Sequence, residues 1–198
     1  MVSKGGILER EKRDKGGGLM EKVDATIVSV LQALGAPVHR TKLVKLIYLI
    51  DQLFYEHFGQ TMTGLGYMWD DFGPNAIGNA IVKEADRLAN KGIVHMDPRP
   101  NYYGETSYLY SLERGKAGLA EKLPEAERYV VRDVVAHYAK YGVRDIVRVS
   151  KQTEPFKNAE QYSVLKMKRS AEYENLMQDV KSDPDFIKGI EEAARALD

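Results

Sequence analysis

The sequence predicts a mainly α-helical fold with one small β-hairpin, an α+β domain that is winged-helix-like and carries additional C-terminal helices. Apolar residues recur at helical spacing over most of the chain, short extended runs replace them near residues 93–112, and helical spacing then returns. The order helix, helix, helix, hairpin is that of a winged helix. A chain of 198 residues provides enough surface for one such domain and a small appendage.

The composition is that of an ordinary soluble globular protein. Hydrophobic residues make up 43% and charged residues 29%, and the formal net charge is zero, so no overall charge draws the chain to nucleic acid or to an anionic membrane. The absence of cysteine excludes disulfides, thiol nucleophiles and cysteine-ligated zinc. The longest apolar run, residues 46–50, is far shorter than the roughly 20 residues of a membrane span. We therefore expect a cytoplasmic protein without a membrane-spanning segment.

The chain divides into three predicted regions. Residues 1–19 are charged and interrupted by glycines, which predicts a flexible arm or a segment of non-native origin. Residues 20–160 form the main domain. Residues 161–198 are predicted to be an acidic helical extension, since residues 171–198 hold eight acids against three bases.

Two helices are expected to open the domain. The first follows the apolar spacing of residues 20–34 and is ended by Gly35 and Pro37. The second covers residues 41–58, with Gly59 as its C-terminal cap. Its apolar arc is so broad that we expect this helix at the centre of the core.

The loop of residues 60–74 carries several aromatic residues, which predicts an ordered loop whose aromatic side chains pack inward. Pro74 then predicts the first turn of a third helix, because proline is tolerated there. This helix is expected to continue to about Lys91, with an inner face of Ile77, Ala80, Ile81, Ala85 and Leu88.

A β-hairpin is predicted from residues 93–96 and 106–112, with a turn through residues 98–101. The second half of the chain then returns to helical spacing. Helices are expected at residues 124–141, 143–151, 170–180 and 183–197.

One motif stands out between residues 42 and 74. An apolar helix carries polar residues at fixed positions and is followed by a loop marked with glycine and proline. The motif residues, for which a structural role is expected, are Lys42, Lys45, Tyr48, Asp51, Gly64, Phe72, Gly73 and Pro74. The pattern resembles the signature of the Panacea domain, the SocA-like antitoxin family, and extends to the Glu-Pro-aromatic element at residues 154–156.

The resemblance implies a protein-binding module without enzymatic activity. Members of that family act as antitoxins that neutralise a toxin partner, or as adaptors that deliver one to a protease. The expected partner is thus a protein, in this case a toxin encoded nearby, with homodimerisation left open. The resemblance implies no cofactor.

The residues themselves offer no catalytic constellation. Asp51 ends an apolar run, and a buried carboxylate needs donors, so we expect it to cap a helix or to bond the loop of residues 64–73. No second acid lies nearby in a pattern for acid–base chemistry. The four histidines lack the spacing of metal ligands, and the glycine clusters lack the context of a phosphate loop, so no metal or nucleotide site is predicted.

Aromatic residues mark the predicted partner-binding surface, because aromatic side chains concentrate binding energy at interfaces. The candidates are Tyr67 and Trp69 in the loop and Tyr102 and Tyr103 at the hairpin tip. A purely structural role, in which these rings pack the loop and hairpin onto the helices, is the alternative.

A winged-helix DNA-binding regulator is the competing functional hypothesis. It would place the third helix in the major groove and residues 98–104 as the wing, which requires exposed bases there. The helix offers Lys83, Arg87 and Lys91, against Glu84 and Asp86. The later helices offer a denser set, interspersed with acids, in Arg128, Arg132, Lys140, Arg144, Arg148 and Lys151.

Overall fold

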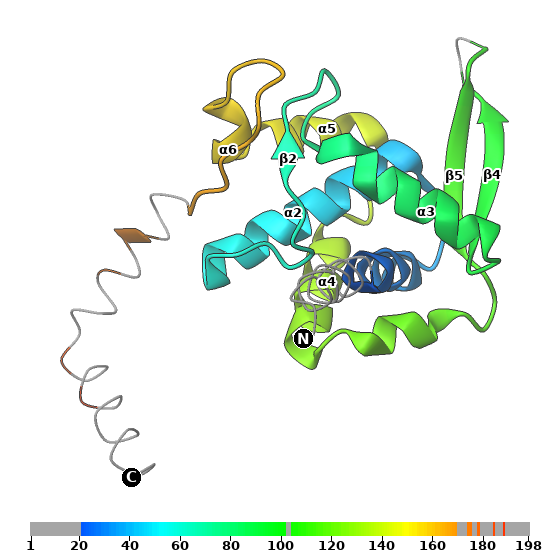
Figure 1. The fold of residues 1–198 in the computed structure, drawn as a ribbon, viewed down its shortest axis with the longest axis horizontal. Coiled ribbons are helices and arrows are strands. Elements are labelled where there is room, and N and C mark those ends of the chain that lie inside the picture. The colour runs from blue at the N-terminus through cyan, green and yellow to red at the C-terminus, as the bar shows by residue number, and fades with distance from the viewer. Residues whose placement is uncertain are drawn as a thin grey trace, which may run out of the picture.

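The computed structural model describes residues 21–101 and 104–169, together with residues 174, 175, 178, 184 and 188. It is mostly helical with a small antiparallel sheet, so the predicted α+β class is confirmed. The winged-helix arrangement stays a prediction. The predicted prefix and, apart from the five isolated positions, the predicted tail helices lie outside the described residues. Figure 1 shows the hairpin at one end of the molecule and helix α6 at the other, with α2 running between them.

Helix α2 (Arg40–Phe58) forms the centre of the core, as predicted. It packs against α3, α4, α5, β1, β3 and β5, and eleven of its nineteen residues are buried. Its C-terminal cap is Gly59, whose φ of 71° lies in the left-handed region and whose N–H bonds the Tyr55 carbonyl. The preceding helix, residues 21–34, also ends as predicted, with Gly35 at a φ of 61°.

The third helix does not begin at Pro74, so this prediction is wrong. Strand β2 (Tyr67–Met68) pairs with β3 (Asn75–Ala76), which holds the chain after Pro74 extended. The 3₁₀ turn η1 (Ile77–Asn79) follows, and its last two residues, Gly78 and Asn79, lie in the left-handed region directly before α3 (Ala80–Asn90). Ile77 is 47% exposed and is not part of the inner face, whereas Ile81, Ala85 and Leu88 are buried as expected.

The hairpin is present; its second strand has the predicted bounds, and its first strand is longer than predicted. Strands β4 (Val94–Pro100) and β5 (Thr106–Leu112) are antiparallel, and Pro98 and Pro100 pair with β5 instead of forming the expected turn. Strand β1 (Val38–His39), which the sequence did not predict, pairs with the other side of β5. The sheet order is therefore β1-β5-β4.

The second half of the described chain is helical. It contains η2 (Ala117–Lys122), α4 (Glu125–Tyr138), α5 (Val143–Lys151) and α6 (Glu154–Lys157). Helix α5 has the predicted bounds, and α4 ends about one turn earlier than predicted. Both pack against α2, which is thereby covered on most sides.

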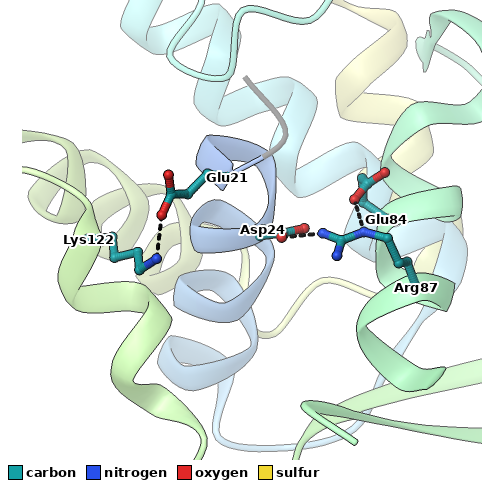
Figure 2. Close-up of polar contacts among 5 residues, drawn as sticks. All are labelled: Glu21, Asp24, Glu84, Arg87 and Lys122. Carbon is teal, nitrogen blue, oxygen red and sulfur yellow. Dashed lines mark hydrogen bonds and ion pairs between the residues drawn. The ribbon is translucent and has the colours of Figure 1, made fainter. Parts of the chain in front are cut away.

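Ion pairs hold the helix of residues 21–34 in place from two sides. Figure 2 shows the Arg87 guanidinium of α3 between the carboxylates of Asp24 and Glu84, with an Nε–Oε2 distance of 2.6 Å to Glu84. On the side of this helix opposite Arg87, the Lys122 ammonium of η2 pairs with the Glu21 carboxylate. The two carboxylates raise the pKa of the Arg87 guanidinium through their hydrogen bonds, so its charge is fixed.

Residues beyond α6 return to the domain and lie alongside β2. The N–H of Trp69 donates to the Ser163 carbonyl at 2.8 Å, and the N–H of Leu165 donates to the Tyr67 carbonyl at 2.8 Å. The side chain of Leu165 is buried. The segment is therefore joined to β2 by an isolated antiparallel bridge between Met68 and Val164.

Candidate functional site

The site is built on four polar residues of α2 that lie three positions apart. Each of Lys42, Lys45, Tyr48 and Asp51 is a surface neighbour of the next, since residues at i and i+3 are adjacent, and because a turn takes 3.6 residues the row winds about half way around the helix. Each makes hydrogen bonds to a different, sequence-distant segment. This polar stripe therefore ties the surrounding elements to the central helix.

Asp51 bonds the loop that follows the helix, in line with the expectation from the sequence. Its carboxylate is fully buried and accepts the N–H of Thr63 at 2.8 Å, the Thr63 hydroxyl and the Tyr67 hydroxyl at 2.6 Å. Burial raises the pKa of Asp51 to about 6, although these hydrogen bonds act in the opposite direction. Every donor belongs to the loop, so Asp51 sets the loop path.

Lys45 is also buried, and it holds the next part of the loop. Its ammonium donates to the Pro74 carbonyl at 2.6 Å. Burial lowers the pKa of Lys45 to about 8, an effect that the nearby Asp70 carboxylate partly opposes. The contact fixes the backbone at the point where the loop enters β3.

Lys42 and Tyr48 bind the later helices. The Lys42 ammonium donates to the carbonyls of Ala139 and Tyr141, both at 2.7 Å, just beyond the C-terminal end of α4. A cation there satisfies free carbonyls and complements the helix dipole. The Tyr48 hydroxyl lies 2.6 Å from the Thr153 hydroxyl, the residue before α6.

Gly73 allows the loop to pass close to α5. Its φ is 89°, and an added Cβ would lie 3.0 Å from the Ser150 hydroxyl and 3.5 Å from Cε of Lys45. Lys151 of α5 donates to the Asp71 carbonyl at 2.6 Å. The loop of residues 70–74 is therefore held by both α2 and α5.

This loop presents Phe72 to solvent. The side chain is 71% exposed, the largest value among the exposed apolar residues of the described chain. A groove of about 420 Å³ lies beside it, between the first half of α2 and the start of α3. Lys45, Asp70, Val82 and Lys83 line the groove with Phe72. An exposed aromatic ring on a fixed loop beside a groove is the geometry of a protein-binding anchor.

The structure corrects part of the predicted partner-binding surface. Tyr67 is completely buried, because its hydroxyl reaches Asp51 and its ring packs edge-on against Tyr48 at a centroid distance of 5.0 Å. The prediction that Tyr67 contacts a partner is therefore wrong. Tyr102 and Tyr103 lie outside the described residues, so their role stays a prediction.

Trp69 is half-buried and belongs to an aromatic cluster. It stacks on Phe156 of α6 at a centroid distance of 5.2 Å and meets Tyr162 edge-on at 5.4 Å. Tyr162 is exposed and donates to the Asp71 carboxylate at 3.1 Å. Trp69 therefore supports the loop that carries Phe72, and its part in partner binding stays a prediction.

The sequence reasoning missed Phe72 as a surface residue, because aromatic residues in a loop were expected to pack inward. The signal available was Asp70-Asp71 directly before it and Gly73 directly after it, a combination typical of an exposed turn. It also did not predict the contacts of Thr63 with Asp51 and of Lys151 with the loop, because these depend on the tertiary fold.

Most bases proposed for DNA binding are held by acids or carbonyl groups. Arg87 is held between two carboxylates, and Arg99 lies 2.7 Å from the Asp97 carboxylate. Arg128 and Arg132 share Glu125, and the latter contact is 2.8 Å long. These four arginines of the wing and helices therefore already have acidic partners, with which phosphate groups would have to compete.

The described residues include no cluster of three or more His, Cys, Asp or Glu side chains that could hold a metal ion. No helix in this described part is both long and apolar enough to cross a bilayer.

Fold and site together define a mainly helical α+β domain in which one central helix positions an exposed loop. The family model described as "Antitoxin SocA-like, Panacea domain" matches residues 43–157, more than half of the 198 residues. The chain belongs to this family, which confirms the resemblance seen in the sequence. No curated protein and no solved structure matches the chain.

Proposed function

We propose that this protein is a non-enzymatic antitoxin that binds a protein toxin and neutralises it by covering the toxin's working surface. Membership of the SocA-like family supports the antitoxin role. The observation that carries the binding mode is the exposed Phe72 ring, held beside a groove by Lys45 and Lys151. Because the loop is fixed before binding, little conformational entropy is lost when a partner covers it.

Co-expression tests this proposal directly. The product of the neighbouring gene is expressed alone and together with the full chain, and growth and co-purification are measured. We expect toxicity from the neighbour alone and a stable complex with restored growth from the pair. A neighbour that is harmless alone, or that does not co-purify, contradicts the antitoxin role.

The Phe72→Ala variant tests the proposed surface. In the complex we expect the toxin to cover the Phe72 ring. Its removal should then cost about 2 kcal/mol of binding free energy, which corresponds to roughly thirtyfold weaker affinity. The matched control is Phe58→Ala, which removes another exposed ring, 55% exposed, at the far end of α2. Equal affinity of the two variants for the toxin contradicts the surface, even where the wild-type pair forms a complex.

Delivery of the toxin to a protease is a second way in which the antitoxin would neutralise it. The lifetime of the toxin in cells separates the two forms. Simple occlusion leaves the toxin in a lasting complex, whereas delivery shortens its lifetime when the antitoxin is present.

A further inference from the structure

A second groove, of about 390 Å³, lies between α2, α4 and α5 and shares no lining residue with the groove beside Phe72. The apolar side chains that line it are Leu49 and Leu53 of α2, Val134 and Tyr138 of α4, and Val149 of α5. On α2 and on α4 these residues lie four positions apart, so they share one face of each helix. Leu53, Tyr138 and Val149 stay partly exposed, so the groove offers apolar surface to an occupant.

Two carboxylates line the groove from different helices. Glu56 lies on α2 and Asp133 on α4, and neither has an ion-pair partner in the described chain. Glu56 accepts only a long contact from Nε2 of Gln52, at 3.5 Å. Among the described residues that line the groove, none is lysine or arginine, and His137 is the one basic side chain. The groove therefore carries uncompensated negative charge, which favours a cationic occupant.

Gln52 adds a hydrogen-bond acceptor to the same lining. Its side chain is buried, at 7% exposure, and its Nε2 donates to the Lys168 carbonyl at 3.2 Å. Its Oε1 has no hydrogen-bond partner within the described part of the chain. Buried acceptors are rarely left without a donor. An ammonium or guanidinium group of an occupant would supply one.

The backbone around the groove favours a helical occupant. Every described residue that lines it belongs to α2, α4 or α5, or to the turn of residues 152 and 153 after α5. The groove has no strand edge with which an extended peptide could pair, whereas a helix bonds its own backbone groups. Helix α2 lines the groove over residues 49–56, about 10 Å of helix axis, which is the length of about two turns of an occupant.

The tail of the same chain starts beside this groove, because the Lys168 carbonyl is bonded to Gln52. Its charge does not fit. Residues 171–198 hold eight acids against three bases, and Glu56 and Asp133 repel further acids. The lining thus favours a partner with the opposite charge.

We propose that the groove between α2, α4 and α5 binds an amphipathic helix of a protein partner that carries lysine or arginine beside its apolar face. The apolar face packs on Leu53, Tyr138 and Val149, and the cations pair with Glu56 and Asp133. The inference goes beyond the antitoxin role and does not depend on it, since its test uses no toxin and the groove is separate from the one beside Phe72.

The test uses the full chain and three labelled peptides of about four helical turns, measured by fluorescence anisotropy. The first peptide is amphipathic, with leucine along one face and lysine on both sides of that face. The second has glutamate in place of lysine, and the third has the composition of the first in an order that gives no apolar face. We expect the first to bind at least about tenfold more tightly than either of the others. Equal binding of the first and another peptide, or no binding of the first at about 1 mM, overturns the proposal.

Two double variants show whether the groove acids attract the peptide. Glu56→Gln combined with Asp133→Asn removes both charges with little change in shape. This variant should bind the lysine peptide about fivefold more weakly, the effect expected for two exposed ion pairs. The control combines Glu121→Gln with Glu160→Gln, two exposed acids outside the groove, and should change the affinity less than about twofold. Unchanged affinity in the groove variant, or equal losses in both, overturns the proposal.

Backbone amide chemical shifts of the isotope-labelled full chain locate the peptide. The lysine peptide should shift the amides of residues 49–56 and 133–138 and leave those of the loop of residues 70–74 unchanged. Shifts confined to residues 170–198 overturn the proposal, because they mean that the acidic tail alone holds the basic peptide. Shifts confined to the loop of residues 70–74 also overturn it, because they place the peptide at Phe72.

Discussion

Individual polar residues within an apolar helix determine where the rest of the chain lies. Lys42, Lys45, Tyr48 and Asp51 each bond a segment that is distant in sequence, and for the buried Lys45, Tyr48 and Asp51 the contact replaces the water that the group has lost. Their types match their partners: the two ammonium groups meet backbone carbonyls, and the carboxylate meets donors. Replacing any of them by an apolar residue would leave its partner unsatisfied.

The buried Asp51 carboxylate makes stability depend on pH in a specific direction. Its pKa is about 6 in the folded protein against an ordinary value of 3.8, so the folded state binds more protons between these pH values. The free energy of unfolding contributed by Asp51 is therefore largest below about pH 4 and decreases as the pH rises to about 6. By linkage the total decrease is roughly 3 kcal/mol.

Urea unfolding of the wild type and of Asp51→Asn at a series of pH values measures this contribution. Asparagine does not titrate, so the unfolding free energy of the wild type minus that of the variant should decrease from pH 4 to pH 6 and stay constant above. A difference that increases with pH over this range would show that the pKa of Asp51 is lowered by folding.

Among the elements, helices were predicted more accurately from sequence than the short strands. The bounds of α2 and α5 follow from apolar spacing and, for α2, from Gly59, which are local signals. Strand β1 has two residues and exists because β5 lies beside it, which no local pattern reports. Pro74 was misread for the same reason, since the extended path after it depends on β2 and on Lys45.

Arg87 connects two elements, and its removal should be costly. In Arg87→Met, the carboxylates of Asp24 and Glu84 lose their shared partner while staying largely buried, at 13% and 6% side-chain exposure. We expect a loss of about 2–3 kcal/mol in the free energy of unfolding, measured by urea titration. The control Arg148→Met breaks an exposed pair with Asp145 and should cost less than about 0.5 kcal/mol. Equal losses would mean that the Arg87 contacts contribute little.

On the scale of the whole molecule, the structured part continues beyond the residues that match the family. The match ends at residue 157, yet residues 163–165 pair with β2 and Gln52 of α2 donates to the Lys168 carbonyl at 3.2 Å. This segment lies against β2, in the loop that Asp51 bonds. The division of the chain at residue 160 stays a prediction, and these contacts show where it should be tested.

Substitutions at two neighbouring residues, the buried Leu165 and the exposed Val164, test whether the segment after residue 160 stabilises the domain. Leu165 is 5% exposed and Val164 is 61% exposed. Leu165→Ala should lower the free energy of unfolding by about 2–4 kcal/mol, because it leaves a cavity under the loop. Val164→Ala should change it by less than about 0.5 kcal/mol. A single unfolding transition with similar midpoints for both variants would show that the segment adds no stability to the domain.

In the candidate site, a contact of Asp51 with the loop was among the expectations from the sequence, whereas the exposed ring of Phe72 was not. Asp51 was expected to bond the loop, because a carboxylate at the end of an apolar run needs donors, and it does so through Thr63 and Tyr67. The exposure of Phe72 was missed, because Tyr67 and Phe72 are both aromatic residues of one loop and all such residues were expected to pack inward. Which of them faces the core depends on contacts with α2 and α5, which are set by tertiary structure.

The polar stripe of α2 also imposes an order of events during synthesis. Lys42 and Tyr48 leave the ribosome about a hundred residues before the carbonyls of Ala139 and Tyr141 and the hydroxyl of Thr153 that bind them. Contacts between such distant segments form late, because the intervening chain must first be brought together. Until residue 153 has emerged, Lys42 and Tyr48 of the central helix lack these partners, and the incompletely folded nascent chain is accessible to proteases and chaperones. The domain, and with it the fixed loop around Phe72, is therefore completed only after residue 153 has been synthesised.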